Sequence, residues 1–319
     1  MKNIWLQLLV ILVTVAVMGK LLERPQIKLT NQLREEGLIS DKLSQDDQIK
    51  IGQTGYAVAL GGLRSLVAAG MNLQATNAFS DQDWVEVEEL YNIMVVLQPK
   101  NSFYWKNAGW HMGYNAYHDF EYKYGLTRSE RGLKKRAYHR KGEDFFLRAT
   151  KENPDDISLW SELGELFSNN HQPYDFPKAA AYYKRATECS DVTDRNLRRY
   201  FYVLARVKGS EKEAYELGKK LINRGDNRDK PSMRSIHFVN AIIHDPSLVD
   251  SEELMQEAFL GNKSLAYVDL ANYWLRSQSE PFPTDNLREV ISRLATELNV
   301  ADHLNPLVNP KMDRLNTIE

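Results

Sequence analysis

The stretch SLWSELGELF, residues 158–167, places one glycine inside an otherwise bulky, apolar helix face. Trp160, Leu163, Gly164 and Phe167 follow one another at intervals of three, one and three positions, so they share one side of an α-helix. The glycine lets the backbone of a neighbouring helix approach, while the larger side chains need a further partner to cover them. The stretch therefore predicts one half of a helix hairpin that is stable only beside other hairpins.

The same pattern recurs in register on both sides of this stretch. Pro99 and Pro154 each precede a tryptophan, Trp105 and Trp160, by six residues. The positions that repeat are Trp105, Ala108 and Gly109 in an upstream first helix, Gly142, Phe146 and Ala149 in its second helix, and Ala179, Tyr183 and Ala186 in the second helix that follows SLWSELGELF. Elsewhere, apolar residues recur at helical spacing between Pro, Gly, Asn and Asp clusters, without the alternation of a strand. The sequence predicts an all-α fold.

This set of residues resembles the tetratricopeptide repeat family over roughly residues 60–190. The resemblance implies an α-solenoid, with repeat-like hairpins at residues 55–190 and diverged hairpins with a C-terminal capping helix at residues 191–319. A basic insertion at residues 116–141 departs from the family pattern. The capping helix is expected in PTDNLREVISRLATELN, starting from a cap at Thr284 or Asp285.

The N-terminus carries an apolar run that predicts a single transmembrane anchor at residues 1–22. A cleaved signal peptide is the alternative, although the expected cleavage site matches poorly. Either interpretation places the bulk of the chain outside the cytoplasm, beyond a polar spacer at residues 23–54. Gly61, Ser65 and Ala69 lie four residues apart, which predicts a helix face that a neighbour can approach closely.

The resemblance also implies which side chains line the concave surface of such a solenoid. The expected partner-binding residues are Lys106, Asn107, Trp110, Tyr114, Arg195 and Arg199. Lys106, Arg195 and Arg199 match in type the family's clamp for a peptide carboxylate, whereas Trp110 and Glu162 stand where that clamp has asparagine. A full clamp is therefore not expected, and an acidic segment of a partner protein is the candidate ligand. Packing of Trp110 and Tyr114 in the core is the alternative to ligand contact.

The insertion is strongly basic in a chain whose net charge is only -2. Its basic patch consists of Arg128, Arg131, Lys134, Lys135, Arg136, Arg140 and Lys141. Anionic lipid, a polyanion or an acidic partner would suit this patch, and a merely solvated helix face is the alternative.

The residues that could support catalysis are few. His111 and His118 lie seven positions apart, so they share a helix face at a separation of roughly 10 Å, too far for one metal ion unless the helix ends between them. The single cysteine, Cys189, has no catalytic signature around it. The sequence also lacks the common nucleotide, hydrolase and zinc-protease motifs. No catalysis, cofactor, metal, small-molecule substrate or nucleic acid is expected.

Together these features predict a membrane-anchored scaffold that binds a partner protein or helps to assemble a complex. A structural subunit docked permanently in an oligomer or on anionic lipid is the alternative. A more remote alternative is a divergent metal-dependent enzyme that uses His111 and His118.

Overall fold

The computed structural model describes residue 28, residues 63–170 and residues 173–317, and these residues form helices joined by turns. No strand occurs in these ranges, so the all-α prediction is confirmed for them. The predicted anchor at residues 1–22 and the spacer at residues 23–54 lie outside the described residues. Within the described part, no helix is both long enough and apolar enough to cross a bilayer.

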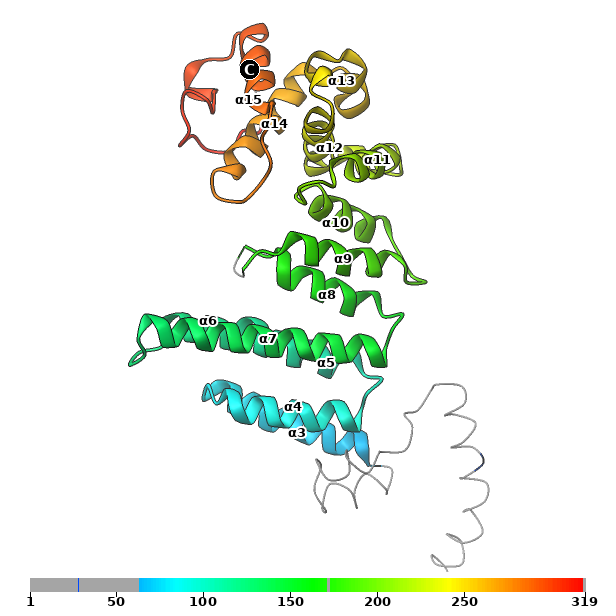
Figure 1. Cartoon of the computed structure of the whole chain (residues 1–319), viewed down its shortest axis with the longest axis vertical. Helices are drawn as coiled ribbons and strands as arrows, with labels where there is room; N and C mark the ends of the chain where they lie inside the picture. The colour runs from blue at the N-terminus through cyan, green and yellow to red at the C-terminus, as the bar shows by residue number, and fades with distance from the viewer. Residues whose placement is uncertain (1–27, 29–62, 171–172, 318–319) are drawn as a thin grey trace, which may run out of the picture.

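The elements follow one another along the long axis of the molecule (Figure 1). They are α3 (Arg64–Ser80), α4 (Trp84–Leu97), α5 (Ser102–Trp110), the π-helix η1 (His111–Ala116), α6 (Tyr117–Tyr122), α7 (Arg128–Glu152), α8 (Ile157–Ser168), α9 (Phe176–Thr187), α10 (Asp194–Leu204), α11 (Glu211–Ile222), η2 (Asn227–Asp229), α12 (Pro231–His244), η3 (Pro246–Asp250), α13 (Glu252–Phe259), α14 (Lys263–Ser277), α15 (Leu287–Glu297) and η4 (Asp302–Leu304). Helices adjacent in the sequence pack on one another: α3 on α4, α8 on α9, α9 on α10, and α11 on α12.

The repeated tryptophans make the same contact in two places. The indole Nε1 of Trp105 donates a hydrogen bond to the carbonyl of Pro99 at 2.8 Å, and Trp160 donates to the carbonyl of Pro154 at 2.8 Å. Each bond ties the first helix of a hairpin to the turn before it. The six-residue spacing of proline and tryptophan thus corresponds to one recurring local structure.

Glycines lie where helices of one hairpin approach most closely. A Cβ atom at Gly164 would lie 2.6 Å from the ring of Tyr183, and one at Gly109 would overlap the ring of Phe146. At Gly142 the neighbour is main chain, because a Cβ there would lie 2.5 Å from the Cα of Gly113. Each glycine therefore allows a helix contact that a side chain would prevent.

The long helix α7 joins two hydrophobic clusters. Phe145 packs into the cluster built by α3, α4 and α5, and Phe146 packs into the cluster that continues through α8 to α15. Because neighbouring residues on α7 are buried in different clusters, this helix couples the two halves of the molecule.

The insertion is built differently from a surface loop. η1 and α6 continue α5, while α7 begins at Arg128 behind a capping box between Thr127 and Glu130. Both helices of this hairpin are therefore lengthened, and α6 with the start of α7 extends past the ends of the neighbouring hairpins (Figure 1).

Two local predictions can be compared with the structure. In α3, Ser65 and Ala69 are exposed and Ala68, Ala75 and Ala78 form the buried face, so within the described residues no neighbouring helix covers the predicted small-residue face; Gly61 lies outside the described residues. The capping helix α15 (Leu287–Glu297) has Asn286 as its N-cap, one or two residues later than the predicted cap, and Asn286 adopts a left-handed conformation with φ 63°. Residues 301–317 then fold back, so α15 is not the last packed element.

Candidate functional site

The predicted partner-binding residues are distributed over three elements. Lys106 and Asn107 on α5 are half-buried, and Trp110 at the end of α5 is 48% exposed. On α10, Arg195 is exposed and Arg199 is half-buried. The side chains of Lys106, Asn107, Arg195 and Arg199 form no hydrogen bond or ion pair with another described residue. No other described residue occupies their donors, which could therefore bind a ligand.

The carboxyl group of Glu162 on α8 interacts electrostatically with basic residues of α5 and α10. It is half-buried, and its pKa is raised first by burial and then by the neighbouring carboxylate of Glu165. Lys106 and Arg199 act in the opposite direction on the same pKa. Because both basic groups act on one carboxylate, Lys106, Glu162 and Arg199 share one electrostatic environment, which we call the α5–α8–α10 face.

Tyr114 belongs to the core below this face. It is only 9% exposed, and its hydroxyl is buried without a hydrogen-bond partner among the residues that the structure places. Burial raises the pKa of Tyr114, and the charges of Glu165 and Glu162 raise it further. Its position favours packing over direct ligand contact, so of the two aromatic candidates only Trp110 presents its ring to solvent.

The sequence prediction of contact residues omits the acidic pair Glu162 and Glu165. Glu165 accepts hydrogen bonds from the Tyr183 hydroxyl at 3.0 Å and from the Asn169 amide at 3.2 Å. The spacing of three residues puts both carboxylates on one side of α8. This spacing is visible in the sequence and could have identified the acidic pair. The face therefore carries two acidic groups together with Lys106 and Arg199, an arrangement of charges suited to a charged peptide.

Two members of the basic patch form ion pairs with other described residues, and Lys134 lies 5.9 Å from the ring centre of Phe120. Lys135 pairs with Glu121 at 2.9 Å and lies 4.5 Å from the ring centre of Tyr117, while Lys141 pairs with Glu88. The remaining members are exposed or half-buried along α7: Arg128, Arg131, Lys134, Arg136 and Arg140. Tyr122 and Tyr124, 82% and 101% exposed, lie at the same end of the hairpin.

His111 and His118 have different surroundings. His111 packs against the rings of Phe79 and Tyr91, with centroid distances of 4.8 and 5.6 Å, and its Nδ1 lies 3.0 Å from the Asn115 amide. His118 Nδ1 lies 3.6 Å from Glu121. Within the described ranges, no group of three or more His, Cys, Asp or Glu side chains is placed to hold a metal ion.

The environment of His111 predicts a pH-dependent stability. Burial lowers the pKa of His111 from 6.5 to about 4, so the folded state binds this proton less readily than the unfolded chain does. Stability is therefore complete above pH 6.5 and falls as the pH decreases toward 4, by on the order of 1–2 kcal/mol after solvent screening. We measure the free energy of unfolding by urea at pH 7 and at pH 4.5. Between these two pH values, the His111→Phe variant is expected to lose less stability than the native chain. An equal loss in both would contradict the assignment, and His118→Gln serves as the control.

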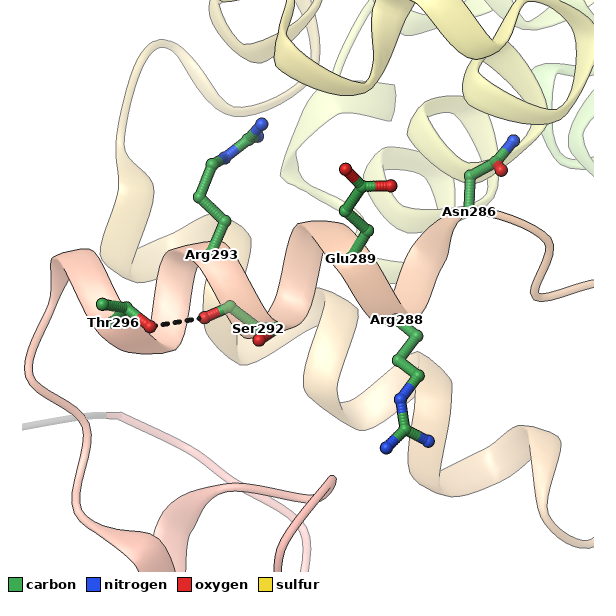
Figure 2. A pocket seen from close by; sticks show the side chains of 6 residues that line it. All are labelled: Asn286, Arg288, Glu289, Ser292, Arg293 and Thr296. Atoms are coloured by element: carbon green, nitrogen blue, oxygen red, sulfur yellow. Dashed lines mark hydrogen bonds between the residues drawn. The ribbon is translucent and has the colours of Figure 1, made fainter.

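A hollow of about 570 Å³ on α15 is the other candidate surface (Figure 2). The side chains of Asn286, Glu289 and Arg293 project from the upper side of α15 in this view, and Arg288 projects from the opposite side (Figure 2). The Asn286 amide donates to the carbonyl of Ile242 at 2.9 Å, and Arg293 donates to the carbonyl of Val249 at 2.9 Å. These bonds use the two side chains to attach α15 to the preceding helices, so the hollow is better explained by packing.

No protein-family model matches the chain, and no curated protein matches it.

Proposed function

We propose that this protein is a membrane-anchored scaffold that binds a partner protein, or helps to assemble a complex, through the α5–α8–α10 face. In this proposal the hairpins form a tetratricopeptide-like α-solenoid, the face is its concave surface, and residues 1–22 hold it at the membrane with the bulk of the chain outside the cytoplasm. The observation that carries the proposal is that Lys106 and Arg199, which come from different helices, both lower the pKa of the Glu162 carboxyl group.

The chemistry of the face favours a peptide with acidic groups. Lys106, Arg195 and Arg199 offer donors that no described residue occupies, and charge-assisted bonds to carboxylates are among the stronger hydrogen bonds. Trp110, four residues after Lys106 on α5, supplies exposed aromatic area, and arginine and tryptophan are residue types enriched among those that dominate binding energy in interfaces. A folded partner or an extended acidic segment could bind both the basic donors and the Trp110 ring.

The proposal is tested by affinity capture of the full-length protein in detergent. We expect a partner captured by the native chain to be lost from the Arg195→Glu/Arg199→Glu variant, because the reversed charges repel an acidic segment. The matched control is Lys212→Glu/Lys220→Glu, which makes the same change in charge at exposed positions of α11. A photo-cross-linking residue at position 110 should capture the same partner, and one at position 220 should not.

One specific observation favours a second candidate function, permanent docking on anionic lipid. The end of the α6–α7 hairpin combines exposed basic groups with exposed Tyr122, Tyr124 and Leu133, a composition typical of segments that bind a membrane surface. The capture experiment separates the two: if the Arg195→Glu/Arg199→Glu variant retains every partner, the α5–α8–α10 face is not the binding surface and this hairpin becomes the leading candidate.

A further inference from the structure

A second cavity lies between α12, α14 and the segment that follows α15. Its volume is about 280 Å³, and its walls include Arg234 and Ser235 on α12, Asp269 and Asn272 on α14, and the chain at residues 314–316. All four of these side chains are at least nine-tenths buried. The cavity is therefore a built, polar site inside the C-terminal half of the molecule.

Asn272 holds the backbone of the returning segment at two points. Its Nδ2 donates to the carbonyl of Leu315 at 2.8 Å, and its Oδ1 accepts from the Leu315 amide at 2.8 Å. A side-chain amide that pairs with both main-chain groups of one residue reproduces what a neighbouring β-strand would offer. Such a contact recognises extended backbone whatever the side chain is.

The leucine side chain supplies the specific part of the contact. Leu315 is only 7% exposed and belongs to the large hydrophobic cluster, and Met312 packs against the same cluster. Earlier in the segment, the Tyr267 hydroxyl donates to the carbonyl of Leu304 at 3.0 Å. α14 thus binds the segment after α15 by its backbone, and at residues 312–315, which are not helical, also by one apolar anchor, Leu315. Grooves bind extended peptides in the same way.

Because Asn272 is buried, its amide group depends on a bound segment for its hydrogen bonds. Asn272 is 9% exposed, so removing Leu315 would leave a buried amide without partners, which is unfavourable unless another peptide or water replaces the segment. The cavity beside Leu315 also retains space that the segment does not fill.

We propose that the site formed by α12 and α14 around Asn272 binds an extended, leucine-bearing peptide segment of a partner protein, and that residues 312–317 of this chain occupy it in competition. The site is separate from the α5–α8–α10 face. A tethered segment acts at an effective concentration on the order of millimolar, so one with an intrinsic dissociation constant of about 100 µM would keep the site about tenfold less available.

The test uses full-length protein in detergent and a fluorescent peptide with the sequence of residues 309–317, NPKMDRLNT. Fluorescence anisotropy should show that the Leu315→Asp variant, whose segment is displaced, binds this peptide about tenfold more tightly than the native chain does. Adding Asn272→Ala to this variant should weaken binding by about tenfold, because both backbone bonds are lost. A peptide with aspartate in place of leucine should not bind either protein, and Arg195→Glu/Arg199→Glu should leave peptide binding unchanged.

The proposal is overturned if folded Leu315→Asp protein does not bind the peptide at millimolar concentration, or if Asn272→Ala makes no difference. A second measurement covers the case in which that variant does not fold. A specific protease site is inserted after Val308, which is 58% exposed, and the chain is cleaved once folded. Saturable exchange of the cleaved segment for labelled peptide would support the proposal, and failure of the labelled peptide to replace it would refute it.

Discussion

Replacing Gly142 with alanine is expected to lower the free energy of unfolding by about 3 kcal/mol. The added Cβ would lie 2.5 Å from the Cα of Gly113, 2.6 Å from its N and 2.9 Å from the carbonyl oxygen of Gly109. These atoms are main chain of η1 and α5, so no side chain can rotate away, and α7 must move instead. Since α7 joins both hydrophobic clusters, the displacement affects the whole molecule. Urea or thermal unfolding monitored by circular dichroism measures the loss.

Gly132 in the same helix provides the matched control. The nearest atom to a Cβ there is the guanidinium Nη1 of Arg136 at 3.5 Å, an ordinary contact with the end of a flexible side chain. Gly132→Ala should therefore raise stability by about 0.5–1 kcal/mol, because alanine favours the helix. If Gly142→Ala raised the free energy of unfolding as Gly132→Ala does, this result would contradict the close contact between α7 and η1.

Replacing Asp269 with alanine is expected to cost about 3–5 kcal/mol, because it leaves the charge of Arg234 buried without its partner. The two side chains are 5% and 9% exposed, and Arg234 Nε donates to Asp269 Oδ2 at 2.6 Å. Arg234 also donates to the carbonyl of Arg228 at 2.7 Å, so it cannot easily turn toward solvent. The chemical unfolding midpoint of Asp269→Ala, compared with the native chain, measures this effect.

The double variant Arg234→Met/Asp269→Leu separates the charge from the packing. Removing both charges should recover most of the lost stability, since an apolar pair of similar volume is often as stable as a buried ion pair. Lys263→Ala is the control for an exposed ion pair, that of Lys263 with Glu297, and should change the midpoint hardly at all. A double variant as unstable as Asp269→Ala would show that shape, and not the unpaired charge, accounts for the loss.

Much of the local structure could be predicted from the sequence. The spacing of Pro154 and Trp160 predicted where a first helix begins, and Gly164 predicted where a second helix approaches it. These features depend on residues close together in the chain, whose helical geometry is nearly invariant. For the same reason, the predicted contact residues Lys106 and Arg199 could be placed on helix faces, although their proximity to Glu162 could not be derived.

The tertiary structure decided the rest. Whether Tyr114 faced a ligand or the core depended on the packing of α7 and α8 over it, which its own helix does not encode. Arg234 and Asp269 are 35 positions apart, and Asn272 and Leu315 are 43 apart. Pairs this distant leave no periodic signal, because they form only when the intervening chain has folded and its hydrophobic faces have been buried. The sequence by itself determined the helices and, in the repeated hairpins, the faces that pack together, and the burial of those faces determined which polar groups meet.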